Sequence, residues 1–91
     1  MKHIVVIGAG VAGIAAAVKL VEQGCRVTLL EDRPYVGGRA RSFVDEHTGD
    51  VIDNGQHLLM GCYHNFLYVL RQLGTDHHLE WQPSLRVKFA A

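Results

Sequence analysis

Apolar and polar residues are grouped in blocks along the first thirty positions of the chain. Apolar residues gathered in short blocks predict strands over His3–Ile7 and Arg26–Leu30. The first of these strands is expected to be buried on both faces, as strands of parallel sheets are. The stretch between them, Val11–Gln23, has its small and apolar residues at helical spacing and is closed by Gly24. This order predicts an α/β fold that begins with a Rossmann-like βαβ unit.

The pattern changes after residue 40. Arg41–Asp45 and Asp50–Ile52 flank a polar turn, which predicts a β-hairpin. Tyr63–Leu73 is predicted to be an amphipathic helix that stops at Gly74. Its apolar positions, spaced i, i+3, i+4 and i+7, are Phe66, Val69, Leu70 and Leu73. Alternation over Leu85–Phe89 predicts a half-buried strand.

Three glycines join the first strand to the first helix in the pattern Gly-x-Gly-x-x-Gly. In such a turn Gly8 allows the tight bend, Gly10 lets the backbone approach a pyrophosphate, and Gly13 allows helix and strand to pack closely. The free amide N–H groups and the dipole at the helix start favour a phosphate. Glu31 ends the second strand roughly 20 residues on, where an acid can accept both ribose hydroxyls. The combination predicts a dinucleotide site.

A second glycine pair, Gly37-Gly38, is followed by Arg39. The two glycines allow the backbone to approach a ligand, and the guanidinium can neutralise a phosphate. A flexible surface turn with a solvated arginine is the alternative, and the preceding dinucleotide motif favours phosphate contact. Asp76–His78 is interpreted as a solvated loop, since no nearby element supplies a third metal ligand; no metal is expected.

The composition limits the classes of partner that the chain is expected to bind. The 91 residues, enough for at most one small domain, carry no net charge, so neither nucleic acid nor an acidic membrane surface is indicated as a partner. Cys25 and Cys62 have no metal or redox spacing, which fits a reducing cytoplasm. Lys2 and the following uncharged run resemble a secretory signal, but three glycines and Lys19 interrupt it.

The glycine motif, Ala17, Glu31 and then Gly37-Gly38-Arg39 together resemble the flavin-containing amine oxidase and phytoene desaturase superfamily. The resemblance implies FAD rather than NAD, on a glutathione-reductase-like FAD fold. The cofactor contacts that it implies run from amides through ribose and adenine to phosphate. They are Gly8, Gly10, Val11, Ala12 and Gly13, then Glu31, Asp32 and Arg33, then Gly38 and Arg39.

Asp53–His57, followed by Gly61-Cys62-Tyr63, is similar to the squalene-associated FAD-dependent desaturases, also called hydroxysqualene dehydroxylases. In the superfamily the equivalent of this stretch runs beside the flavin ring, which implies contacts from Gly55, Gln56, His57 and Leu58. His57 is the one candidate for a catalytic group. A hydrogen-bonding structural histidine is the alternative.

The resemblance implies an FAD oxidoreductase acting on a long isoprenoid, with hydroxysqualene reduced to squalene in hopanoid precursor synthesis. A carotenoid desaturase, an amine or protoporphyrinogen oxidase, and a non-redox module that binds lipid or protein are the alternatives. Enzymes of this kind are several times longer, so we expect an N-terminal fragment, with FAD-binding residues 1–60 and the start of a substrate region over 61–91. A cytoplasmic location is expected, with peripheral membrane contact through the missing part.

Overall fold

The first third of the chain folds as the predicted βαβ unit. The structure, a computed structural model, describes residues 1–55, 58–84 and 88. Strands β1 (His3–Ile7) and β2 (Arg26–Leu30) pair in parallel, with His3 opposite Arg26. Helix α1 (Val11–Glu22) connects them and ends one residue earlier than expected, since Gln23 is its C-cap. Gly24 then takes the predicted left-handed conformation, at φ +84°.

The expectation that β1 is buried on both faces is wrong for this chain. Residues alternate along the strand between half-buried and exposed, with Val5 52% and Ile7 85% exposed. Among the described elements α1 alone packs against the two strands, so one face of the sheet is covered. The apolar run therefore indicated the strand correctly, while the number of layers around it could not be read from the run.

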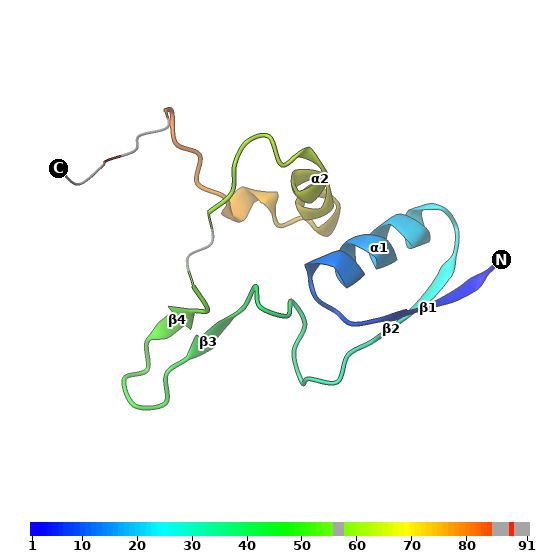
Figure 1. Ribbon diagram of the computed structural model, residues 1–91, viewed down its shortest axis with the longest axis horizontal. Coiled ribbons are helices and arrows are strands. Elements are labelled where there is room, and N and C mark those ends of the chain that lie inside the picture. The colour runs from blue at the N-terminus through cyan, green and yellow to red at the C-terminus, as the bar shows by residue number, and fades with distance from the viewer. Residues whose placement is uncertain (56–57, 85–87, 89–91) are drawn as a thin grey trace.

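The predicted hairpin is present with shorter strands. Strands β3 (Ser42–Val44) and β4 (Val51–Asp53) pair in antiparallel register, Phe43 opposite Ile52. Gly49 stands in the turn at φ +76°, and its N–H donates to the Asp45 carbonyl. All residues of both strands are exposed. The hairpin extends away from the βαβ unit (Figure 1).

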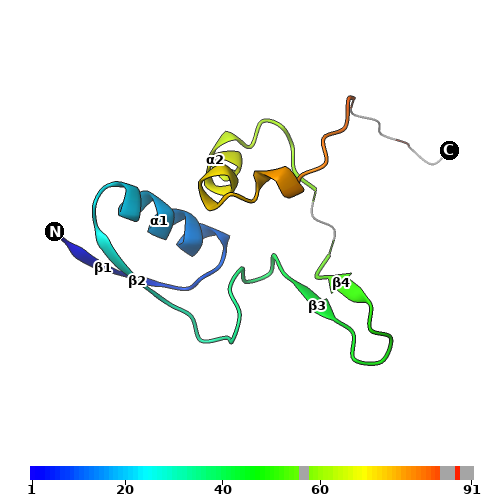
Figure 2. The ribbon, with the colours of Figure 1, turned by 180° about the vertical axis from the view of Figure 1, so that it is seen from behind.

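Helix α2 (His64–Leu73) matches the predicted amphipathic helix, and Gly74 ends it in a left-handed conformation at φ +72°. Asp76–His78, interpreted as a solvated loop, is exposed as expected, but the segment forms a short 3₁₀ helix, η1, rather than an irregular loop. Helix α2 packs against α1, where the Tyr68 hydroxyl donates to Glu22 Oε2 at 2.6 Å. Both ribbon views show α2 beside α1, on the side away from the sheet (Figure 1 and Figure 2).

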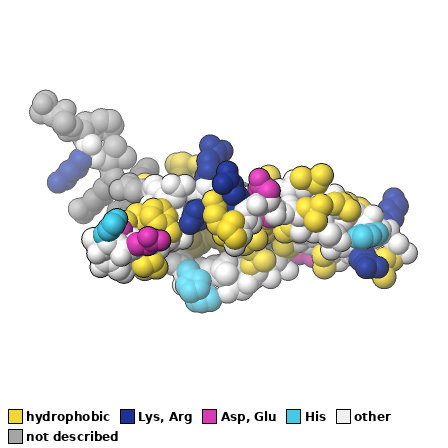
Figure 3. All heavy atoms as spheres, turned by 90° about the horizontal axis from the view of Figure 1, so that it is seen from below, with side chains coloured by type: hydrophobic (Ala, Val, Ile, Leu, Met, Phe, Trp, Pro, Cys, Tyr) yellow, Lys and Arg dark blue, Asp and Glu magenta, His cyan; other side chains and the backbone are white. Residues whose placement is uncertain are grey.

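The resulting arrangement is open. Its radius of gyration is 16.5 Å, against about 12 Å for a compact domain of this length. In the described residues the buried apolar side chains are Ala9 and Leu67, and many large hydrophobic residues lie at the surface, some of which are visible from below (Figure 3). No described helix has both the length and the apolar run needed to cross a bilayer.

Two predictions concern parts of the chain that the structure does not test. The strand expected over Leu85–Phe89 lies outside the described residues, apart from Lys88. The division into residues 1–60 and 61–91 stays a prediction.

Candidate functional site

The turn between β1 and α1 has the geometry that its glycines predict. Gly8, at φ +99°, turns the chain, and its N–H donates to the Leu30 carbonyl at 2.7 Å, which extends the sheet pairing by one step. A Cβ atom on Gly13 would lie 1.7 Å from the Gly8 carbonyl oxygen. No side chain fits there, so close packing of helix on strand requires glycine at position 13.

Gly10 differs from Gly13 in what surrounds it. A Cβ atom on Gly10 would meet nothing within 4 Å, so the space in front of this backbone is open. Gly10 is the N-cap of α1, no side chain caps the helix, and its first turn holds no acidic residue. The amides of Val11 and Ala12 belong to that first turn, where N–H groups have no partner within the helix. The helix start thus offers donors and space to an anion.

Glu31 braces the glycine turn against the loop after β2. Its Oε1 accepts the Ala9 N–H at 2.9 Å, and its Oε2 accepts the Arg33 N–H at 3.0 Å. These bonds, first that from Ala9 and then that from Arg33, lower the pKa of Glu31 from 4.5 to about 2. The carboxylate is therefore ionised at neutral pH. An ionised carboxylate has about four acceptor positions, so two bonds leave room for ribose hydroxyls.

Ala9 is the residue at which three segments meet, and sequence reasoning missed it. It is fully buried; besides its N–H bond to Glu31, its carbonyl accepts the Gly37 N–H at 2.7 Å. Gly10 and Gly37 form a parallel bridge, and a Cβ atom on Gly38 would lie 3.3 Å from Gly10 Cα. The second glycine pair thus runs directly beside the first turn. An alanine between two glycines carries no sequence signal of such a role.

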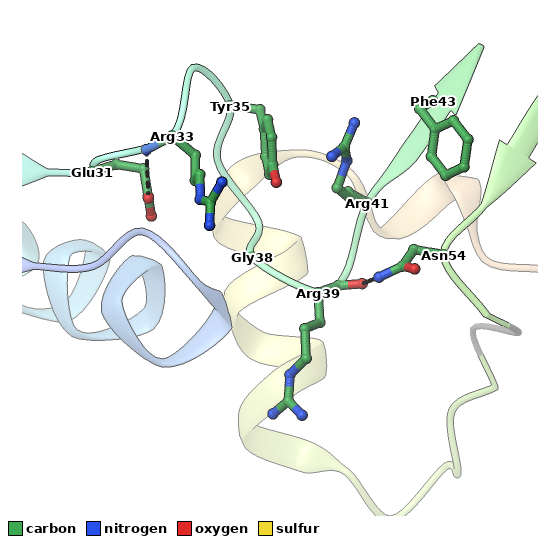
Figure 4. A pocket seen from close by; sticks show the side chains of 8 residues that line it. All are labelled: Glu31, Arg33, Tyr35, Gly38, Arg39, Arg41, Phe43 and Asn54. Carbon is green, nitrogen blue, oxygen red and sulfur yellow. Dashed lines mark hydrogen bonds between the residues drawn. The ribbon is translucent and has the colours of Figure 1, made fainter. Parts of the chain in front are cut away.

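Two cavities open around this junction. The larger, of about 920 Å³, is bounded by the glycine turn, by the Gly37–Ala40 segment and by α2, which contributes Asn65, Phe66 and Val69. The smaller, of about 380 Å³, lies between the loop after β2 and the hairpin (Figure 4). Its lining residues are Glu31, Arg33, Tyr35, Gly38, Arg39, Arg41, Phe43 and Asn54. Gly38 and Arg39 line both cavities, so the two adjoin at that point.

Arg39 is held in place through its backbone. Its carbonyl accepts the Asn54 side-chain amide at 3.0 Å, which ties the end of β4 to the glycine pair. Its side chain points away from Arg41 and Asn54 in the close view (Figure 4). Asn54 was overlooked as a positioning residue, although it stands in the polar stretch that the sequence singled out.

The structure brings most of the predicted site together. The predicted site residues that line the two cavities are Gly8, Gly10, Val11, Ala12, Gly13, Glu31, Arg33, Gly38 and Arg39. Asp32, Gly55 and Leu58 line neither, and Leu58 is 82% exposed. Gln56 and His57 lie outside the described residues, so their roles stay predictions. Within the described part of the chain, no three metal-ligating side chains come together.

Comparison with known proteins identifies the family. The family of flavin-containing amine oxidoreductases matches residues 11–90. The chain belongs to this family. A hydroxysqualene dehydroxylase from Rhodopseudomonas palustris is 45% identical over 75 residues, which are 82% of the chain and 18% of that protein. A zeta-carotene desaturase from Zea mays is 43% identical over 76 residues, which are 84% of the chain and 13% of that protein.

A solved structure supports the fold. Reduced UDP-galactopyranose mutase is 42% identical with a TM-score of 0.59, and the match covers 69% of the chain and 13% of the mutase. The chain therefore spans less than a fifth of the length of each of these three proteins.

The residues present fit the flavin that the family carries, in its dinucleotide form, FAD. The open space at Gly10 matches the room that a pyrophosphate needs, and the Glu31 carboxylate stands where an adenine ribose is held. Arg39 lines the cavity in front of the helix start, where its charge complements a diphosphate.

Proposed function

We propose that the chain is the FAD-binding part of a flavin-dependent oxidoreductase that acts on a long isoprenoid, with reduction of hydroxysqualene to squalene as its reaction. The observation that carries the proposal is the junction at Ala9. There the glycine turn is joined to the Glu31 carboxylate and to the backbone of the second glycine pair by hydrogen bonds of the Ala9 backbone, and it opens onto two adjoining cavities.

FAD would lie across both cavities on a glutathione-reductase-like fold. The adenine ribose binds at Glu31, and the diphosphate binds in front of Val11 and Ala12 with Arg39 beside it. The stretch from Gly55 to Leu58 would then continue toward the flavin ring. When bound, FAD supplies the hydride chemistry, while the chain binds and orients it and keeps water away.

The substrate proposal is supported by the identity to a hydroxysqualene dehydroxylase and by the Asp53–His57 stretch. In the proposed reaction a carbon–oxygen bond breaks and a carbon–hydrogen bond forms, the hydroxyl leaves as water, and the two electrons come from reduced FAD. The enzyme would be cytoplasmic and would reach its apolar substrate by peripheral contact with a membrane.

A carotene desaturase is the second candidate, favoured by 43% identity to the zeta-carotene desaturase of Zea mays. That chemistry runs in the opposite direction, since it removes two hydrogens from the isoprenoid and passes two electrons to oxidised FAD. The two are separated by incubating the full-length protein with hydroxysqualene plus reduced FAD, and with zeta-carotene plus an electron acceptor. We expect squalene in the first assay. Desaturated carotene in the second, with no squalene in the first, would overturn the substrate proposal.

A module without redox chemistry is tested by colour. A flavoprotein purifies yellow, with flavin absorbance in proportion to protein. A colourless protein that folds, and that takes up no FAD when it is added, would exclude the oxidoreductase and leave a lipid- or protein-binding role.

A further inference from the structure

Arg41 lines the smaller cavity, where its side chain lies against two aromatic rings, although it is not part of the glycine motifs. Its guanidinium carbon lies 3.9 Å from the centre of the Tyr35 ring and 5.4 Å from that of Phe43 (Figure 4). A guanidinium stacked on an aromatic face is held by the ring while its N–H groups remain free at the edge. Such an edge binds phosphate with two parallel hydrogen bonds.

The backbone at Arg41 is fixed as well. Its carbonyl accepts the Asn54 N–H at 2.9 Å, and the next residue, Ser42, pairs with Asp53 at the start of the hairpin. The side chain thus begins from an anchored strand end and finishes against Tyr35 on the opposite loop. Little freedom is left for a ligand to remove, which favours binding.

The charge of the smaller cavity also indicates an anion. Three arginines, Arg33, Arg39 and Arg41, line it with a single acid, Glu31. Both carboxylate oxygens of Glu31 already accept backbone N–H groups. Among the described residues, one ion pair has its charged atoms within 4 Å of each other, and it joins Lys19 to Glu22. None of the three guanidinium groups is therefore paired with a described carboxylate. The cavity therefore carries an excess of positive charge.

We propose that Arg41 is a phosphate-binding residue of the smaller cavity and that Tyr35 is the platform that positions it. The phosphate belongs either to the dinucleotide or to a separate phosphoanion. In the first case the inference rests on the proposed function. Arg41 then adds a cofactor contact beyond those that the glycine motifs and Arg39 provide.

The test titrates the full-length protein, freed of bound nucleotide, with ADP, adenosine and inorganic pyrophosphate, and follows binding by backbone amide NMR shifts. Arg41→Gln should weaken ADP binding about tenfold, which corresponds to about 1.4 kcal/mol, and should leave adenosine unchanged. Arg41→Lys should recover part of the loss, because it keeps the charge but not the planar fork. Tyr35→Ala should weaken ADP binding and Tyr35→Phe should not. The matched control is Arg71→Gln, in the exposed last turn of α2.

The outcomes separate this proposal from the proposed function. Equal loss for adenosine and ADP would show a packing role and overturn it. ADP and pyrophosphate binding that Arg41→Gln leaves intact would also overturn it, while the FAD site would stand. Pyrophosphate binding that depends on Arg41, without any ADP binding, would support Arg41 as a phosphate ligand and contradict the dinucleotide site. Failure of the wild-type full-length protein to bind either phosphate compound would overturn both.

Discussion

Replacement of Glu31 tests whether its carboxylate, which is hydrogen-bonded to the glycine turn, contributes to FAD affinity by binding the adenine ribose. The carboxylate accepts N–H groups from Ala9 and Arg33 at 2.9 and 3.0 Å. Glu31→Ala removes both acceptors. Glu31→Gln keeps one oxygen, but its amide group meets the other N–H donor to donor. We therefore expect FAD affinity to fall in the order wild type, Glu31→Gln, Glu31→Ala.

The magnitude follows from the bonds that the carboxylate makes to FAD. Hydrogen bonds to a charged group contribute about 1.5–3 kcal/mol. At about 1.4 kcal/mol per tenfold change, loss of the ribose bonds should make the alanine variant bind FAD on the order of 10–100-fold more weakly. The Ala9 N–H, which donates to Glu31 in the structure, also loses its acceptor, and this affects the stability of the glycine turn.

The assay is titration with FAD, followed by flavin fluorescence, of the wild-type protein and both variants after removal of bound flavin. Asp32→Ala is the control, because Asp32 lines neither cavity and should change the affinity little. FMN, which lacks the adenine ribose, should be bound equally by all four proteins if the effect is confined to the adenosine end. Equal FAD affinities of wild type and Glu31→Ala would refute the reasoning.

Three other substitutions and one pH series test separate parts of the account. Gly10→Val should spare most of the secondary structure, since a Cβ atom there meets nothing within 4 Å, but should lower FAD affinity by at least about tenfold in the same titration. Gly13→Ala should instead destabilise the fold by about 1–3 kcal/mol or more in urea unfolding, because its Cβ atom overlaps the Gly8 carbonyl; an unchanged midpoint would contradict the packing. Asn54→Ala should weaken FAD binding a few-fold by freeing the Arg39 carbonyl, and identical affinity would remove Asn54 from the positioning residues. The folded pKa of Glu31, about 2, lies below the ordinary 4.5, so its contribution to stability is complete above pH 4.5 and is lost as the pH falls toward 2; thermal midpoints should show this loss in wild type and not in Glu31→Gln.

Local patterns predicted the elements well because their causes are local. The apolar blocks indicated β1 and β2, and the glycines at positions 24 and 74 end their helices in left-handed conformations, as a residue without a Cβ atom permits. The separate requirements at Gly10 and Gly13 were also predictable, since each follows from what a Cβ atom would displace.

The junction at Ala9 was not predictable, because the partners of its backbone N–H and carbonyl depend on how three segments meet. The same holds for α2. Its apolar stripe predicted a buried face, but the sequence did not show that Phe66 and Val69 would line a cavity together with the glycine turn. Exposure of Val5 and Ile7 was missed because a strand's own sequence does not say how many layers cover it.

The central claim is that FAD binds at the glycine turn, between Glu31 and the start of α1. Backbone amide NMR of the full-length protein, freed of bound flavin, during titration with FAD tests it most directly. We predict that the signals of Gly10, Val11, Ala12 and Gly38 shift with a common dissociation constant, while those of η1 stay in place. Shifts confined to α2 and η1, or none at the glycine turn at saturating FAD, would contradict the claim.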